Sequence, residues 1–238
     1  MIPWLLLDKA ATPDGRAELR LMRRGGEFSI NLGSNTLMNS RFSGSEKALA
    51  DLVCDRLRAR PKFRFLIGGL GMGFTLRAAL AGLGGDAQIV VAELVSTIVS
   101  WARGPMADLF AGCLDDPRVA IHEGDVAGVI ASSASHFDAI LLDVDNGPEG
   151  LTQSANDGLY ARKGLEAARR ALRPGGILAI WSAAPNPAFA QRLQHAGFGV
   201  EEVPVRANSN GRGARHIIWL ATKAKTDTGA AQPRSRSR

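Results

Sequence analysis

The chain has 238 residues, of which 45% are hydrophobic and 22% charged, and its formal net charge is +6. This composition indicates a globular protein with a full core. The positive excess is scattered and includes the basic C-terminal PRSRSR, so we interpret it as solvated surface. Nucleic-acid binding is a weaker alternative, because a single tyrosine argues against stacking platforms for RNA.

The two cysteines, Cys54 and Cys113, form neither a disulfide framework nor a metal-ligand pattern, and the four histidines are not at ligand spacing. We therefore predict no metal. The apolar stretch at residues 2–7 is too short for a signal peptide, and no run approaches the roughly 18 apolar residues of a membrane helix. A cytoplasmic protein without a membrane partner is expected.

Three regions follow one another along the chain. Residues 1–44 form a small N-terminal β-hairpin region, in which EFSINLG and NTLMNS are separated by a glycine-serine turn. Residues 45–222 alternate strand and helix patterns and are predicted to form one domain. Residues 223–238 have no apolar face and are expected to be a disordered basic tail.

The middle region alternates helix and strand patterns. A helix begins after Ser43, which has capping-box spacing to Glu46, and it ends before Pro61. Apolar runs then predict parallel strands that are separated by amphipathic helices. The expected strands are 63–69, 88–93, 118–123, 138–143, 177–181, 198–205 and 216–222, and the expected helices are 75–82, 96–103, 126–134, 161–172 and 186–197.

The last two strands are joined without a helix, so they should pair antiparallel. The predicted fold class is α/β: a doubly wound, seven-stranded, mostly parallel sheet of the Rossmann-like kind found in class I methyltransferases. Ligands of such sheets bind at the carboxyl ends of the strands. Side chains at these ends are therefore the candidate site residues.

A glycine-rich turn follows the first strand of this sheet. Gly69, Gly71 and Gly73 connect the strand to the next helix, in FLIGGLGMGFTLR. Glycine allows a tight turn and a close approach of a ligand to the main chain. The G-x-G-x-G spacing favours a nucleoside with an amine or amino-acid tail over a dinucleotide, and we predict cofactor binding here.

Acidic residues follow three other strands. Glu93 ends the second strand and is predicted to accept hydrogen bonds from ribose hydroxyls. Asp125 follows the third strand; it either contacts the adenine amino group or caps the next helix, and the two roles are compatible. Asp143 and Asp145 follow the fourth strand, and we predict them as catalytic residues because paired carboxylates in a cleft favour a raised pKa.

These motifs resemble the spermidine synthase (aminopropyltransferase) family over about residues 26–205. LIGGLGMGFTLR aligns with the strand, GGGDGG and TLR segment of the family, VVAE with its ribose-binding glutamate, and FDAILLD with its catalytic aspartate. The resemblance implies a transferase of polyamine biosynthesis that uses decarboxylated S-adenosylmethionine. It places Glu46 in the substrate-binding Y-H-E motif, Asp125 at the adenine and Asp143 as the base for the attacking amine.

The polyamine half of the family pattern is rewritten in this chain. Met72 replaces the acid of GGGDGG, Gly44 and Ser45 replace the tyrosine and histidine of Y-H-E, and Trp181 replaces a glutamine. The acceptor is therefore left open as an amine or polyamine-like small molecule. A methyltransferase that uses S-adenosylmethionine, with backbone amides at Gly71–Gly73 holding its carboxylate, and a non-catalytic nucleoside-binding protein are alternatives. The hairpin edge also offers a surface for a homodimer.

Overall fold

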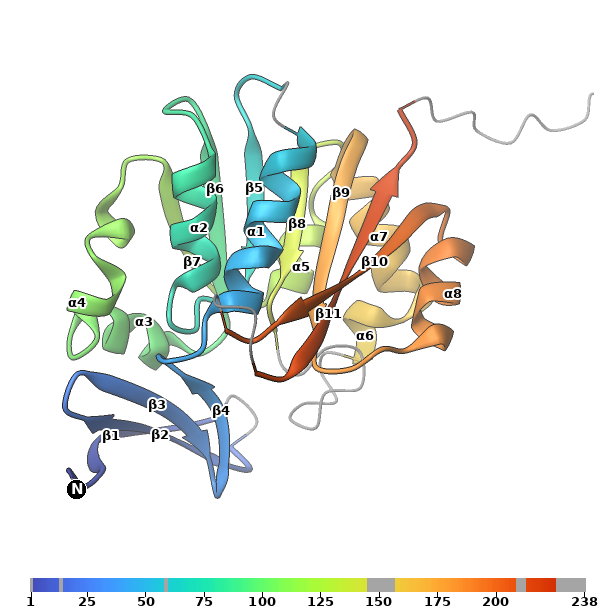
Figure 1. Cartoon of the computed structure of the whole chain (residues 1–238). Coiled ribbons are helices and arrows are strands. Elements are labelled where there is room, and N and C mark those ends of the chain that lie inside the picture. Colours follow the sequence, from blue (N-terminus) through green and yellow to red (C-terminus); the bar gives the residue numbers. More distant parts are fainter. Residues whose placement is uncertain (1, 13–14, 58–59, 145–156, 209–212, 226–238) are drawn as a thin grey trace, which may run out of the picture.

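The computed structural model describes residues 2–12, 15–57, 60–144, 157–208 and 213–225, and it contains two sheets (Figure 1). The smaller sheet is antiparallel and N-terminal. Its strands, in spatial order, are β1 (Leu5–Ala11), β2 (Glu18–Arg24), β3 (Glu27–Leu32) and β4 (Asn35–Asn39).

The predicted hairpin is the second half of this small sheet. Strands β3 and β4 pair around the turn at Gly33, and β1 and β2 extend the hairpin to four strands. Strand β2 has a pattern that the hairpin prediction did not use, since the buried Leu19 and Leu21 alternate with more exposed residues. Strand β1 gives no such signal, because its leucines are exposed.

The larger sheet has seven strands and confirms the predicted fold class. Its spatial order is β10, β11, β9, β8, β5, β6, β7, and only β11 runs antiparallel to its neighbours. The strands are β5 (Arg64–Gly68), β6 (Gln88–Glu93), β7 (Val119–Glu123), β8 (Phe137–Leu142), β9 (Leu172–Ser182), β10 (Phe198–Arg206) and β11 (Arg215–Lys223).

Helices cover both faces of this sheet (Figure 1). Alternate residues of the central strands enter two separate cores: Phe65 and Ile67 of β5 face one core, and Leu66 faces the other. The helices are α1 (Gly44–Leu57), α2 (Phe74–Gly82), α3 (Ser96–Arg103), α4 (Ala107–Phe110), a 3-10 turn (Cys113–Asp115), α5 (Val126–Ala131), α6 (Asp157–Tyr160), α7 (Arg162–Ala171) and α8 (Pro187–His195). In the part of the chain that the structure describes, no helix has the length and hydropathy of a membrane span.

The small sheet lies below the carboxyl ends of the parallel strands in Figure 1. The Trp101 side chain of α3 donates a hydrogen bond from Nε1 to Asp8 Oδ2 of β1 at 2.7 Å. The buried residues Leu21 and Ile30 of the small sheet also belong to the same hydrophobic cluster as α1 and α2. The small sheet thus packs against the carboxyl ends of the strands, where ligands of such folds bind.

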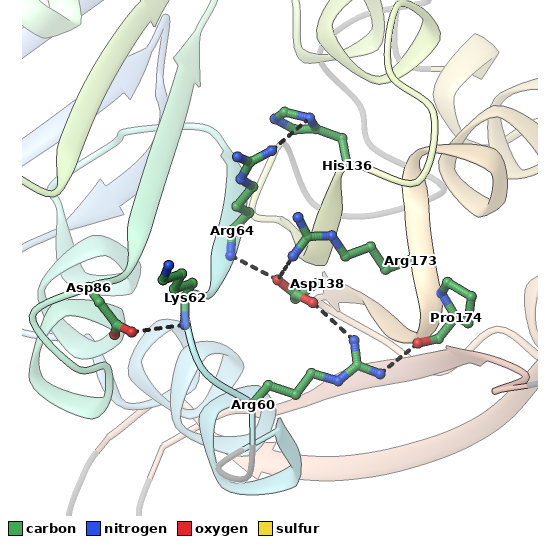
Figure 2. Close-up of polar contacts among 8 residues, drawn as sticks. All are labelled: Arg60, Lys62, Arg64, Asp86, His136, Asp138, Arg173 and Pro174. Carbon is green, nitrogen blue, oxygen red and sulfur yellow. Dashed lines mark hydrogen bonds and ion pairs between the residues drawn. The ribbon is translucent and has the colours of Figure 1, made fainter.

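A network around Asp138 stabilises the opposite side of the large sheet, at the amino ends of its central strands (Figure 2). This carboxylate is 2% exposed. It accepts hydrogen bonds from Arg60 Nη1 at 3.0 Å, from Arg173 Nη1 at 2.8 Å and from the Arg64 backbone N–H at 3.0 Å. The network joins the chain after α1 to strands β5, β8 and β9, far from the carboxyl ends.

Candidate active site

A cavity of about 160 Å³ lies between the small sheet and the carboxyl ends of β5, β6, β7 and β8. One wall comes from the small sheet and is mostly apolar. The other wall comes from the strand ends and holds the carboxylates. The lining residues are Thr12, Leu19, Ile30, Leu32, Leu37, Met38, Gly69, Gly71, Ala92, Glu93, Leu94, Val95, Ile98, Gly124, Asp125, Val126, Asp143 and Val144.

Glu93 ends β6 and is fixed by the main chain around it. Its Oε2 accepts a hydrogen bond from the Leu70 backbone N–H at 2.8 Å, and its Oε1 accepts one from the Val95 backbone N–H at 2.9 Å. Burial raises the pKa of Glu93, and the backbone donors oppose that rise. The backbone N–H groups that act on this carboxylate are those of Leu70, Gly71, Leu94 and Val95, and they fix it at the cavity wall.

The three predicted glycines have different surroundings. Gly69 and Gly71 line the cavity, with positive φ angles of 91° and 50°. A Cβ on Gly69 would lie 2.5 Å from the Asp143 backbone oxygen, and one on Gly71 would lie 2.5 Å from Met38 Cε. Gly73 is not among the lining residues; a Cβ there would lie 2.5 Å from the Phe110 ring. Gly73 thus allows helix packing, while Gly69 and Gly71 shape the cavity wall.

Asp125 caps a helix, which is one of the two roles that the sequence predicted for it. It is the N-cap of α5, where its Oδ1 accepts a hydrogen bond from the Ala127 backbone N–H at 2.8 Å. It also lines the cavity. Capping occupies one lone pair of one oxygen, so the carboxylate retains acceptor capacity toward a ligand.

Asp143 stands at the carboxyl end of β8 and lines the cavity beside Val144. Its Oδ2 accepts a hydrogen bond from Thr75 Oγ1 at 2.7 Å. Burial, together with the negative charge of Glu46, raises the pKa of Asp143 to about 7, and the Thr75 hydroxyl opposes that rise. A carboxylate with a pKa near 7 is suited to act as a general base at neutral pH. Asp145 lies outside the described residues.

Glu46 lies in the first turn of α1 and is not a cavity-lining residue. Its Oε2 accepts a hydrogen bond from the buried Ser45 hydroxyl at 2.7 Å, and Ser45 Oγ lies 3.0 Å from His216 Nδ1 of β11. Burial raises the pKa of Glu46 and lowers that of His216. The His216 ring also packs edge-on against Trp181 at the end of β9, at 4.7 Å between ring centroids.

Thr75 and His216 are site neighbours to which the sequence prediction gave no role, and Ser45 was named only as a departure from the family motif. Thr75 follows the glycine turn as the second residue of the next helix. This position could have indicated that its side chain lies near the site. His216 had no local signal, since it enters the neighbourhood only because β11 pairs antiparallel with β9. Within the described part of the chain, no group of three or more potential metal ligands is found.

The sequence profile of the spermine/spermidine synthase domain matches residues 60–193. The chain belongs to this family. The match runs from the segment before β5 to helix α8, so it contains the glycine turn, Glu93, Asp125 and Asp143. It does not contain the small sheet or Glu46.

Curated relatives support the same family. A polyamine aminopropyltransferase of Nitrosomonas europaea is 35% identical over 109 residues, which is 44% of this chain and 32% of that protein. One of Mycobacterium tuberculosis is 28% identical over 173 residues, 71% of this chain and 31% of that protein. A putrescine N-methyltransferase of Nicotiana tabacum is 37% identical over 119 residues, 50% of this chain and 29% of that protein. These matches span about a third of each relative's length.

Solved spermidine synthases share the fold. The structure of the Thermotoga maritima spermidine synthase has a TM-score of 0.73 at 16% identity, covering 93% of this chain and 73% of that one. A spermidine synthase in complex with the transition-state analogue AdoDATO has a TM-score of 0.72 at 17% identity, with the same coverage of both chains. The small sheet is included in this likeness, because the match extends over nearly the whole chain.

Proposed function

We propose that this protein is a spermidine synthase-like transferase that moves an aminopropyl group from decarboxylated S-adenosylmethionine to an amine acceptor. Membership of the family and the relatives named polyamine aminopropyltransferase support this activity. The acceptor is an amine or polyamine-like small molecule, and its identity stays open.

The charge of the cavity lining favours the decarboxylated donor over S-adenosylmethionine. Its described lining contains three acids, Glu93, Asp125 and Asp143, and no lysine, arginine or histidine. A donor with a sulfonium and an ammonium group gains favourable electrostatic interactions from such a lining. The carboxylate of S-adenosylmethionine finds no cationic partner among these residues.

Several backbone amides of the glycine turn already have partners within the protein. The Gly69 N–H donates to the Ala92 carbonyl at 2.9 Å, and the Gly73 N–H donates to the Leu70 carbonyl at 2.8 Å. The Leu70 N–H donates to Glu93. Most of the turn is therefore hydrogen-bonded within the protein, which disfavours the carboxylate-bearing donor.

In the proposed complex, Glu93 accepts the ribose hydroxyls, Asp125 accepts the adenine amino group, and Gly69 and Gly71 let the nucleoside approach the main chain. Gly73 supports this turn by its packing. Glu46 contributes to binding of the amine acceptor. Asp145 is proposed as a second acid beside the acceptor, on the strength of its place in the sequence alone.

The reaction is a nucleophilic displacement. The acceptor nitrogen attacks the aminopropyl carbon next to sulfur, a C–N bond forms and the C–S bond breaks. The bonding electron pair goes to sulfur, which leaves as neutral methylthioadenosine. The proton of the acceptor nitrogen passes to ionised Asp143, which acts as general base.

A methyltransferase is the second candidate, because relatives named putrescine N-methyltransferase match half of this chain. Its amine acceptor and its base would have the same places, but its donor would be S-adenosylmethionine. The non-catalytic alternative keeps the nucleoside cavity without turnover.

Calorimetric titration with decarboxylated S-adenosylmethionine, S-adenosylmethionine and methylthioadenosine tests the proposal, together with product analysis on a panel of amines. We expect the decarboxylated donor to bind at least tenfold more tightly than S-adenosylmethionine and to give an aminopropylated amine. The reverse preference with a methylated product would support the second candidate. Binding without any product would support the non-catalytic alternative.

A homodimer is the assembly that we propose. Strand β1 is an edge of the small sheet, and its Leu5, Leu6 and Leu7 are 59%, 48% and 39% exposed. Such an apolar edge can pair with a second copy. Sedimentation should show a dimer that Leu6→Asp converts to monomer, and a monomeric wild-type protein would reject the proposal.

A further inference from the structure

Thr75 contacts Asp143, which lines the cavity, and Glu46 of α1. It is the second residue of α2 and is 3% exposed. Its Oγ1 lies 2.7 Å from Asp143 Oδ2 and 3.3 Å from the backbone oxygen of Glu46. The hydroxyl therefore faces two acceptors at once, one of which changes its charge during the proposed reaction.

A hydroxyl has one proton to donate and lone pairs to accept with. While Asp143 is ionised, Thr75 donates to its Oδ2. Once Asp143 has taken a proton at that oxygen, the new O–H can donate to Thr75 Oγ1, and the Thr75 proton can turn to the Glu46 carbonyl. Rotation about one C–O bond thus keeps the pair hydrogen-bonded in both states.

We propose that Thr75 is a positioning residue that holds Asp143 in one place before and after it accepts a proton. The inference rests on the proposed role of Asp143 as base. Thr75 would act through Asp143 and need not contact the substrate. A base that needs no movement of its side chain between the two states meets the geometric demand of proton transfer throughout the reaction.

Other titratable groups near Asp143 must be kept unchanged in a test. Glu46 of α1 raises its pKa, and Lys47 in turn acts on Glu46. Glu93 and Asp125 line the same cavity, and His216 of β11 is connected to Glu46 through Ser45. Substitution of Thr75 alone leaves all of these groups in place.

Thr75→Val keeps the shape of the side chain and removes the hydroxyl, whereas Thr75→Ser keeps the hydroxyl. Loss of the donor disfavours ionised Asp143, so the acid limb of kcat/KM should move upward by about one pH unit in Thr75→Val. At pH 7, kcat should fall about fivefold, because the ionised fraction of Asp143 drops from about a half to about a tenth, while methylthioadenosine affinity stays within about twofold. Thr75→Ser should restore the wild-type profile.

A substrate-free measurement separates this inference from the proposed function. The carboxyl carbon of Asp143 can be titrated by NMR in both variants, and its midpoint should rise by about one pH unit in Thr75→Val alone. Thr97→Val, at the same second position of α3, is the matched control and should leave the midpoint unchanged.

An unchanged Asp143 midpoint in a folded Thr75→Val protein would overturn the inference whatever the enzyme's substrate. A shifted midpoint with no turnover on any donor would uphold the contact and count against the proposed function. If Thr75→Val does not fold, Thr75→Ala and Thr75→Ser provide the same comparison, with the hydroxyl as the difference between them.

Discussion

At the scale of single residues, Asp143 is the side chain on which the proposed chemistry depends. Asp143→Asn keeps the size of the side chain and removes the base. We expect turnover to fall by about 10²- to 10⁴-fold, with methylthioadenosine affinity within twofold of wild type. Initial rates and calorimetry measure the two effects, and wild-type turnover in the variant would exclude Asp143 from the mechanism.

The raised pKa of Asp143 also predicts how stability depends on pH. An aspartate in the unfolded chain ionises near pH 3.8, whereas the folded protein holds this proton to about pH 7. Between these values the folded state binds more protons, so the contribution of Asp143 to stability falls as pH rises and stays low above pH 7. Asp143→Asn should therefore unfold in urea at pH 8 no more easily than wild type does.

Gly69 is the residue whose backbone allows Asp143 to sit where it does. Gly69→Ala should destabilise the fold by about 2 kcal/mol or more, because φ is 91° and the new Cβ would meet the Asp143 carbonyl at 2.5 Å. Gly112→Ala is the matched control: φ is 77°, with no atom within 4 Å of the Cβ. Urea unfolding should show the smaller loss there, about 1 kcal/mol.

At the scale of elements, helix α1 brings a second carboxylate to the site. Its negative charge raises the pKa of Asp143, so Glu46→Gln should lower that pKa and move the acid limb of kcat/KM to lower pH, by about one unit. Asp51→Asn, on the exposed side of the same helix, should leave the limb in place. An upward move in Glu46→Gln would show that its main effect is hydrogen bonding.

Element prediction from the sequence succeeded where burial imposes a clear pattern. Strands β5 and β8 are continuous apolar runs because both of their faces are covered, and glycine or charged residues mark their ends. The prediction failed at β1, whose exposed leucines carry no alternation, and at the start of β9. That strand begins at Leu172, whereas the sequence pattern predicted a helix up to residue 172 and a strand only from residue 177.

At the scale of the whole molecule, the Asp138 network joins segments that are distant in sequence. Asp138→Asn should lower the free energy of unfolding by about 3 kcal/mol, because two arginines would lose their buried anionic partner. Asp115→Asn removes an exposed pair with Arg103 and should cost under about 1 kcal/mol. Equal losses in urea unfolding would show that burial does not decide the value of these pairs.

The same network lies at the amino ends of the strands, away from the cavity. Asp138→Asn should therefore leave methylthioadenosine affinity within twofold of wild type at temperatures where the protein is folded. This separation follows from the parallel sheet, in which ligands bind at the carboxyl ends of the strands and the amino ends make only structural contacts.

The sequence by itself determined the order of strands and helices, the glycine turn and the acids at the strand ends, because burial period and turn chemistry are local properties. It could not determine that Glu46 of α1 acts on Asp143 or that His216 of β11 contacts Ser45, since these residues meet only through the sheet order. Nor could it show that Gly73 packs on Phe110 or that the small sheet forms a cavity wall. Contacts between distant segments and the pKa values that depend on them are set by packing, which only the tertiary structure decides.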